Sequence, residues 1–325
     1  MNDLSIVQPV AVDGSVGPLE KCWDDVQETD VHGRRPFRRR AGRREAQELP
    51  PQTTRARTVR PATLPAIPAV APAELTQTAL VPRSTPPSIG DDWQNLRFVS
   101  PGPRGHFLSG VPLVDFFRAD PAARAFDVLR TQLLQTLRSN GWTRVAIASP
   151  THGCGSTFTA VNLTLSLARI PGSRTVLIDL NHRTPGVAGA LDLAAMGDMR
   201  GFLSGEVAMN RHLVRTSDTL ALGLTAGPDA DAAELLHDAR TADTLDQMTA
   251  ALTPDVVLYD LPPVLEHDDL AAFLPQVDGV LLVADGTRTV ASQIAKCKRM
   301  LEGQTQVLGV ILNRARSRGL GDYGR

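Results

Sequence analysis

The chain has 325 residues with 34 basic and 35 acidic side chains, a formal net charge of −1 at pH 7. This balance argues against general coating of nucleic acid, so no specific nucleic-acid partner is expected. The three cysteines form no CxxC pair, which excludes a disulfide framework and a cysteine-rich zinc site and indicates a reducing compartment. No apolar run approaches the roughly 18 residues of a membrane-spanning helix, and the N-terminus lacks a signal-peptide core, so a cytoplasmic protein is expected.

Prolines divide the chain into two parts. Fifteen of the 24 lie within the first 112 residues, which show no sustained helical or strand period and are expected to be disordered. Seven arginines between Arg34 and Arg44 could attract an anionic membrane surface, although a solvated tail is the simpler interpretation. The sequence predicts a disordered Pro/Arg-rich region over 1–117, one folded domain over 118–315 and a flexible tail over 316–325.

From residue 120 onward, short apolar runs alternate with amphipathic segments. Apolar side chains at helical spacing predict helices over 122–139, 157–168, 235–252, 269–274 and 289–301. Short apolar runs predict strands over 144–149, 175–179, 221–226, 256–260, 279–284 and 307–312. Because strands that are apolar on both faces must be covered on both sides, we expect a doubly wound α/β fold with a mostly parallel sheet. Ligands of such sheets bind beyond the carboxyl ends of the strands.

A glycine-rich turn follows the strand expected at 144–149. It reads Ser-Pro-Thr-His-Gly-Cys-Gly-Ser-Thr over 149–157 and leads into a helix. Its residues Gly153, Cys154, Gly155 and Ser156 would present backbone N–H groups to phosphate oxygens, and Thr157 would offer its hydroxyl to magnesium. Taken alone, the turn favours a nucleotide site no more than an ordinary connection between strand and helix.

Two further strands end in aspartate. Asp179 closes the run at 175–179, and Asp260 closes the run at 256–260. Carboxylates at such strand ends hold Mg²⁺ or its water shell beside nucleotide phosphates. Together with Thr157, they predict a site for ATP and Mg²⁺.

At these strand ends the sequence resembles the cytoplasmic kinase domain of bacterial tyrosine kinases (BY-kinases), which control capsule and exopolysaccharide synthesis. More distantly it resembles the septum-site and partition P-loop ATPases. The resemblance covers about 120–315 and rests on the loop at 149–163, Leu-Ile-Asp-Leu-Asn-His-Arg-Thr-Pro at 177–185 and Asp-Val-Val-Leu-Tyr-Asp-Leu-Pro-Pro-Val at 255–264. It implies a deviant Walker P-loop NTPase fold with ATP and Mg²⁺. It also implies catalytic positions at Asp179, Asn181 and Arg183, and Asn313 near the adenine base.

Two departures from the family pattern affect the expected chemistry. Ser156 occupies the position of the phosphate-loop lysine, a charge worth on the order of 4 kcal/mol about 4 Å from a phosphate at an effective dielectric near 20. Asn181 replaces the aspartate expected to accept the proton of the attacking hydroxyl, which an amide cannot do. With no lysine between residues 22 and 295, Arg183 is the remaining candidate for the cation.

Two other departures affect the expected phosphate acceptor and the expected oligomer interface. Tyr323 is the only tyrosine of the C-terminal tail, where the family has a tyrosine cluster. Arg124, Asp127 and Arg130 stand where the family has its Glu-x-x-Arg-x-x-Arg oligomer interface, with two charges exchanged in sign, so a homo-oligomer would need a rearranged partner face.

These departures favour a catalytically impaired regulator of exopolysaccharide polymerisation or export. It would bind a membrane co-polymerase, encoded as a separate chain, at the inner face of the plasma membrane. An active ATP-dependent autokinase that phosphorylates Tyr323, and a positioning ATPase of the partition type, are the alternatives. The surviving residues form either a weakened nucleotide pocket or a relic that preserves the fold.

Overall fold

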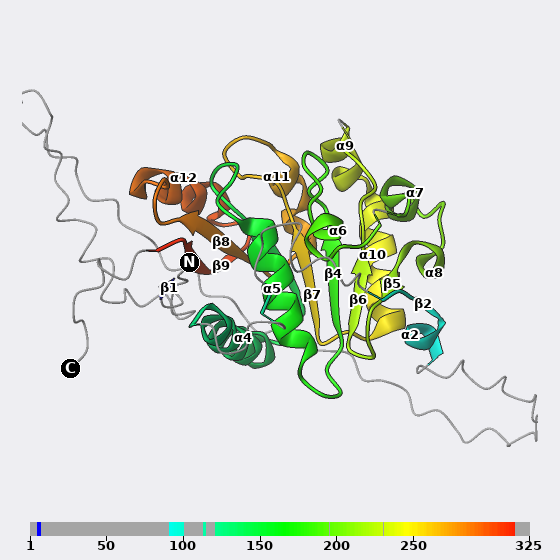
Figure 1. The fold of residues 1–325 in the computed structure, drawn as a ribbon. Coiled ribbons are helices and arrows are strands. Elements are labelled where there is room, and N and C mark those ends of the chain that lie inside the picture. The colour runs from blue at the N-terminus through cyan, green and yellow to red at the C-terminus, as the bar shows by residue number, and fades with distance from the viewer. Residues whose placement is uncertain are drawn as a thin grey trace, which may run out of the picture. The chain divides into compact units, whose positions relative to one another are not determined.

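The computed structural model describes residues 5–7, 91–100, 113–114, 121–194, 196–229 and 231–315 (Figure 1). Their strands form one sheet in the order β1-β9-β8-β3-β7-β4-β6-β5-β2. The central strands, from β9 to β6 in this order, all run parallel to one another. They are β3 (Arg144–Ala148), β4 (Thr175–Asp179), β6 (Leu220–Gly223), β7 (Val256–Asp260), β8 (Gly279–Asp285) and β9 (Gln306–Asn313). The predicted mostly parallel sheet is therefore confirmed.

Short strands complete both edges of the sheet. β1 (Ser5–Val7) pairs antiparallel with β9, and β5 (Val214–Arg215) pairs antiparallel with β6. β2 (Arg97–Phe98) then pairs parallel with β5. These additions explain why the sheet is mixed at its margins while its centre is parallel.

Helices cover both faces of the sheet, and Figure 1 looks onto the face that carries α4 and α5. This face packs against α4 (Pro121–Asn140), α5 (Ser156–Ala168) and α6 (Val187–Ala190). The opposite face packs against α2 (Asp91–Asn95), α7 (Met199–Leu203), α9 (Ala232–His237), α10 (Ala239–Leu252), α11 (Asp269–Phe273) and α12 (Ala291–Leu301). Successive residues of β3 point to alternate faces, with Ile147 in one core and Ala146 in the other. The doubly wound α/β class is confirmed.

The helix expected over 235–252 is instead two helices. Asp238 adopts an extended conformation between α9 and α10 and accepts a hydrogen bond from the backbone N–H of Arg240. An aspartate that caps a helix start in this way ends the preceding helix, because its backbone leaves the helical region. Apolar periodicity continues across the break and therefore could not reveal it.

The domain boundary expected at residue 118 is too late. In α2, Trp93 is buried in the core, and Arg174 lies 5.2 Å from the centre of its ring. Further along, the buried Val114 donates its backbone N–H to Asn162 Oδ1 at 2.8 Å. These ordered segments are too short to show a helical or strand period, so they could not be recognised within the proline-rich region. The arginine block at 34–44 and the tail with Tyr323 lie outside the described residues.

Among the described helices, none combines the length and the apolar character that crossing a membrane requires.

His212 is a buried titratable group that bears on stability. It ends α8 (Met209–His212), stacks on Phe202 with ring centres 4.7 Å apart, and has no hydrogen-bond partner at either ring nitrogen in the described structure. Burial lowers its pKa from the usual 6.5 to about 4. The folded protein therefore holds this imidazole neutral at pH values where the unfolded chain would protonate it.

The change His212→Phe is expected to flatten the acid limb of the stability curve. Between pH 6.5 and pH 4 the unfolded chain binds more protons at His212, so stability falls as the pH is lowered; the pKa shift corresponds to about 3 kcal/mol by pH 4. Urea unfolding of wild type and variant across this range measures the effect. A difference between them that does not change with pH would contradict it.

Candidate functional site

The glycine-rich loop lies between β3 and α5. Gly153 has φ 82° and Gly155 has φ 93°, in the left-handed region that glycine tolerates best. Gly155 also caps α5, and a Cβ at this position would lie 2.2 Å from Asn313 Nδ2. The loop therefore places backbone N–H groups at the start of a 13-residue helix, a geometry suited to phosphate. Ser156 follows at the first helical position and is buried.

Two carboxylates lie at the ends of adjacent strands. Asp179 of β4 and Asp260 of β7 are register partners, and both are fully buried. Thr157 Oγ1 donates to Asp260 Oδ2 at 2.5 Å, which joins the loop to the sheet. Asp179 instead accepts the backbone N–H groups of Asn181, Gly186 and Val187 at 3.1–3.2 Å.

The electrostatics of this pair indicate a place for a cation. Burial raises the pKa of Asp179 to about 6, even though three N–H groups stabilise its charge. Burial and the charge of Asp179 both raise the pKa of Asp260, whose Oδ1 has no hydrogen-bond partner among the described residues. Two carboxylates and a hydroxyl are hard oxygen donors of the kind Mg²⁺ prefers. Thr157, Asp179 and Asp260 therefore fit a magnesium ion, which would offset their charge.

The next two predicted catalytic positions hold local structure. Asn181 Oδ1 accepts the backbone N–H of Thr184 at 3.1 Å, and so fastens the turn after β4. The Arg183 guanidinium pairs with the fully buried Asp269 of α11 at 3.2 Å. In this arrangement the Asn181 side chain stabilises the turn after β4, and the Arg183 guanidinium points toward α11.

Asn313 lies directly against the loop, at the end of β9. Its Nδ2 donates to the carbonyl oxygen of Cys154 at 2.9 Å, and its Oδ1 accepts the backbone N–H of Arg314. Cys154 itself is buried, with its sulfur 3.6 Å from the hydroxyls of Thr151 and Thr289.

Sequence reasoning missed Arg314 as a site residue. Its Nη1 donates to the carbonyl oxygen of Gly153 at 2.9 Å and to Asp285 Oδ2 at 2.7 Å. The sequence feature that could have indicated it is an arginine directly after Asn313, in a chain whose glycine-rich loop has no lysine.

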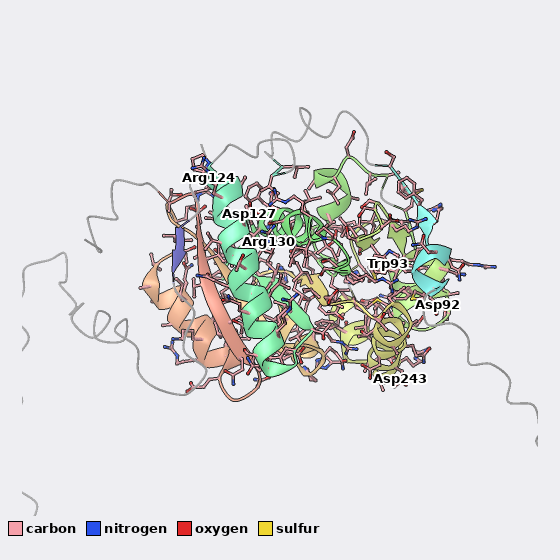
Figure 2. The ribbon with its side chains drawn as sticks, turned by 90° about the horizontal axis from the view of Figure 1, so that it is seen from below. Asp92, Trp93, Arg124, Asp127, Arg130 and Asp243 are labelled. Atoms are coloured by element: carbon pink, nitrogen blue, oxygen red, sulfur yellow. The ribbon has the colours of Figure 1, made fainter. Side chains whose placement is uncertain are left out.

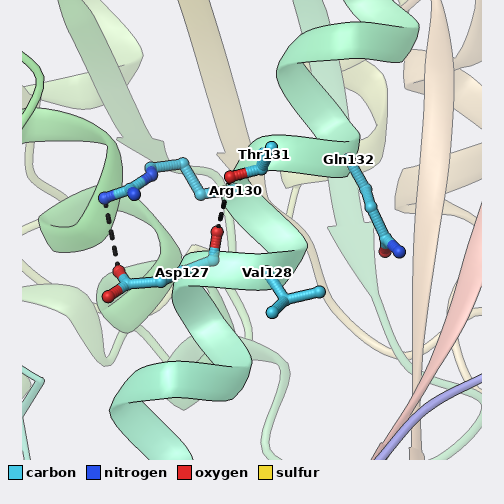
Figure 3. A pocket seen from close by; sticks show the side chains of 5 residues that line it. All are labelled: Asp127, Val128, Arg130, Thr131 and Gln132. Atoms are coloured by element: carbon cyan, nitrogen blue, oxygen red, sulfur yellow. Dashed lines mark hydrogen bonds and ion pairs between the residues drawn. The ribbon is translucent and has the colours of Figure 1, made fainter.

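The positions expected at an oligomer interface lie along α4, where Figure 2 shows Arg124, Asp127 and Arg130. Arg124 is exposed, but Asp127 is engaged within the chain. It pairs with Arg130 at 3.2 Å and with Arg169, and it accepts a hydrogen bond from Ser166 of α5 at 2.8 Å. A groove lined by Asp127, Val128, Arg130, Thr131 and Gln132 lies along this helix (Figure 3). The Asp127 carboxylate thus ties α4 to α5.

Comparison with known proteins supports the resemblance. No family model matches the chain. The tyrosine-protein kinase YwqD of Bacillus subtilis is 30% identical over 182 residues, covering 55% of this chain and 76% of YwqD. The succinoglycan biosynthesis transport protein ExoP of Rhizobium meliloti is 30% identical over 187 residues, covering 55% of this chain and 23% of ExoP.

Among solved structures, the kinase domain of the Escherichia coli tyrosine kinase ETK matches with a TM-score of 0.57 and 24% identity, covering 64% of this chain and 81% of that domain. This likeness shows a shared fold. The chain spans 27% of the length of the first curated relatives that it matches, so only part of those proteins has a counterpart here.

Proposed function

Because the chain belongs to the bacterial tyrosine kinase family, we propose that it is a catalytically impaired member that regulates exopolysaccharide synthesis or export. The observation that carries the proposal is Ser156, a buried neutral residue at the loop position where the family has lysine. The glycine geometry of the loop and the buried oxygen donors of Thr157, Asp179 and Asp260 support a retained, weakened pocket for ATP and Mg²⁺.

The two arginines that could supply the missing charge are already engaged. Arg183 pairs with Asp269, and Arg314 pairs with Asp285 and a loop carbonyl. Binding a triphosphate would therefore rely on backbone N–H groups and the metal ion, which supplies charge neutralisation at the phosphates when it is bound. This arrangement supports binding that is weaker than in a lysine-containing loop.

The residues expected to accept the proton and the phosphate support the same conclusion. Asn181 can donate and accept hydrogen bonds, but an amide cannot take the proton of an attacking hydroxyl at neutral pH. The chain has two tyrosines, and Tyr259 lies fully buried against Phe273 with ring centres 4.8 Å apart. Burial raises the pKa of Tyr259, which disfavours its use as a nucleophile. Tyr323 is left as the candidate acceptor.

The polysaccharide role and the partner are proposed from the relatives. ExoP is named for succinoglycan transport, and the family resemblance implies a membrane co-polymerase or adaptor as partner. The protein would then act at the inner face of the plasma membrane through that partner, with the block Arg34–Arg44 as an additional contact to anionic lipid. A homo-oligomer through α4 would require a partner face that meets Arg124 without displacing Asp127 from Arg130 and Arg169.

The purified full chain is expected to form no phosphotyrosine when incubated with ATP and Mg²⁺, because both the loop cation and the proton acceptor are replaced. Antibody detection and mass spectrometry measure the product. The double variant Ser156→Lys/Asn181→Asp restores both groups and is the matched control, in which phosphotyrosine at Tyr323 would show that the replacements cause the impairment. Wild-type phosphorylation that depends on ATP and disappears in Tyr323→Phe would overturn the proposal.

A further inference from the structure

The end of β9 contacts three successive residues of the phosphate loop. Arg314 donates to the Gly153 carbonyl oxygen at 2.9 Å, and Asn313 donates to the Cys154 carbonyl oxygen at 2.9 Å. Asn313 also fills the space beside Gly155, where a Cβ would lie 2.2 Å from its Nδ2. Both hydrogen bonds reach carbonyl oxygens, so they hold the loop without using the N–H groups that a phosphate would need.

Arg314 is itself held in place at the end of β8. Its guanidinium pairs at 2.7 Å with Asp285 Oδ2, on a side chain that is 1% exposed. The other oxygen, Oδ1, accepts the backbone N–H and hydroxyl of Thr287 at 2.8 and 2.6 Å. The Asp285 carboxylate is therefore satisfied on both oxygens, and it orients the guanidinium toward the loop.

The backbone around Arg314 supports a dedicated role. Its φ of 58° is left-handed, a conformation that costs a non-glycine residue free energy and persists where the surroundings determine it. The carbonyl oxygen of the preceding Asn313 accepts the N–H of Gly286 at 2.7 Å, which fixes this turn to the end of β8. The strained conformation accompanies the contact of Arg314 with the loop.

The loop needs such support because Gly153 and Gly155 lose more conformational freedom on ordering than other residues would, and Ser156 supplies no charge to hold them. We infer that Arg314 is a positioning residue for the phosphate loop: the pair Asp285 and Arg314, the loop latch, keeps the loop in its phosphate-binding conformation. Arg314 acts on the loop through the Gly153 carbonyl. The inference rests on the proposed function only where it concerns nucleotide affinity.

Cys154 provides a probe of the latch that requires no nucleotide. Cys154 is 2% exposed in this loop conformation, whereas Cys297 of α12 is 0% exposed and serves as an internal reference. In the full chain, Arg314→Ala is expected to raise the rate of N-ethylmaleimide labelling at Cys154 by at least about tenfold, the effect of losing a hydrogen bond to a charged group. Mass spectrometry of peptides measures each cysteine separately.

The matched control is Arg240→Ala, which removes an exposed arginine from the ion pair with Asp238 at the start of α10. It should leave Cys154 labelling unchanged. Asp285→Asn should accelerate labelling as Arg314→Ala does, and the double variant should add nothing further, because both changes open the same latch. Arg314→Lys keeps one donor and should give an intermediate rate; with Asp285→Asn it carries the test if Arg314→Ala does not fold.

An unchanged Cys154 rate in folded latch variants would overturn the inference, and so would an equal acceleration at Cys297, which would indicate general loosening. Titration with Mg²⁺ and a fluorescent ATP analogue is the second measurement. If wild type binds and Arg314→Ala binds at least about tenfold more weakly, the latch serves the nucleotide site. If wild type does not bind, the proposed pocket fails, while the thiol result still decides on the latch.

Discussion

Replacing Ser156 by lysine is expected to tighten binding of ATP with Mg²⁺ by about 10- to 100-fold, or about 1.4 to 2.8 kcal/mol. Ser156 directly follows Gly155 at the start of α5, where the loop N–H groups already gather. A full charge about 4 Å from a phosphate is worth on the order of 4 kcal/mol at an effective dielectric near 20. Desolvation of the ammonium at this buried position removes part of that gain, which is why the expected effect is smaller.

The control for this prediction is Ser156→Met, which adds a side chain of similar length without the charge. Isothermal titration of both variants and wild type, repeated at two salt concentrations, separates charge from volume. We expect the gain in affinity for lysine only. Equal, weak binding curves for all three proteins would mean that the loop does not present its N–H groups to phosphate, and the relic interpretation would then hold.

The variant Asp260→Asn is expected to be more stable than wild type at pH 8 by about 1 to 3 kcal/mol, because it removes one of two adjacent buried charges. The sign follows from linkage. The pKa of Asp179 is raised to about 6 from 3.8, so the folded state binds more protons than the unfolded state between these values. This contribution makes wild-type stability fall as the pH rises through that window, and it persists in the variant. The variant loses the further fall that is due to Asp260, whose pKa is raised by burial and by the charge of Asp179.

Chemical denaturation at pH 8 and pH 4 measures this effect. The difference in stability between the variant and wild type should shrink toward pH 4, where Asp179 and Asp260 of folded wild type are largely protonated. Asp218→Asn, at a side chain that is 85% exposed, is the control and should change stability little. Mg²⁺ with nucleotide should raise the melting temperature of wild type but not of Asp260→Asn. If the variant is less stable than wild type at pH 8, the hydrogen bond between Thr157 and Asp260 stabilises the fold by more than the buried charge of Asp260 destabilises it.

Short apolar runs predicted the central strands well. The runs ending at Asp179 and Asp260 match β4 and β7 residue for residue, because a strand buried on both faces requires an uninterrupted apolar run. In a parallel sheet, such strands bring their carboxyl ends to one edge. For this reason the residue types at three strand ends were sufficient to predict that Thr157, Asp179 and Asp260 lie near one another.

Contacts that join distant segments were beyond this reasoning. β1 has three residues, pairs with β9 and carries no pattern of its own. The charge of Asp127 was visible in the sequence, but its use was not, because Arg169 and Ser166 come from another helix. Arg183 was the expected cation, yet it turns to Asp269, and Arg314 reaches the loop instead.

The sequence by itself determined the α/β class, the order of the central helices and strands along the chain, and the departures from the family pattern at Ser156 and Asn181. Each of these depends on residue type and local spacing. Only the tertiary structure decided which side chains meet at the loop. Asp285 ends β8 and Arg314 directly follows β9, while Gly153 lies more than 130 residues before either. Such a contact forms only when the order and register of β3, β8 and β9 bring the three segments together, and these depend on the packing of the whole sheet.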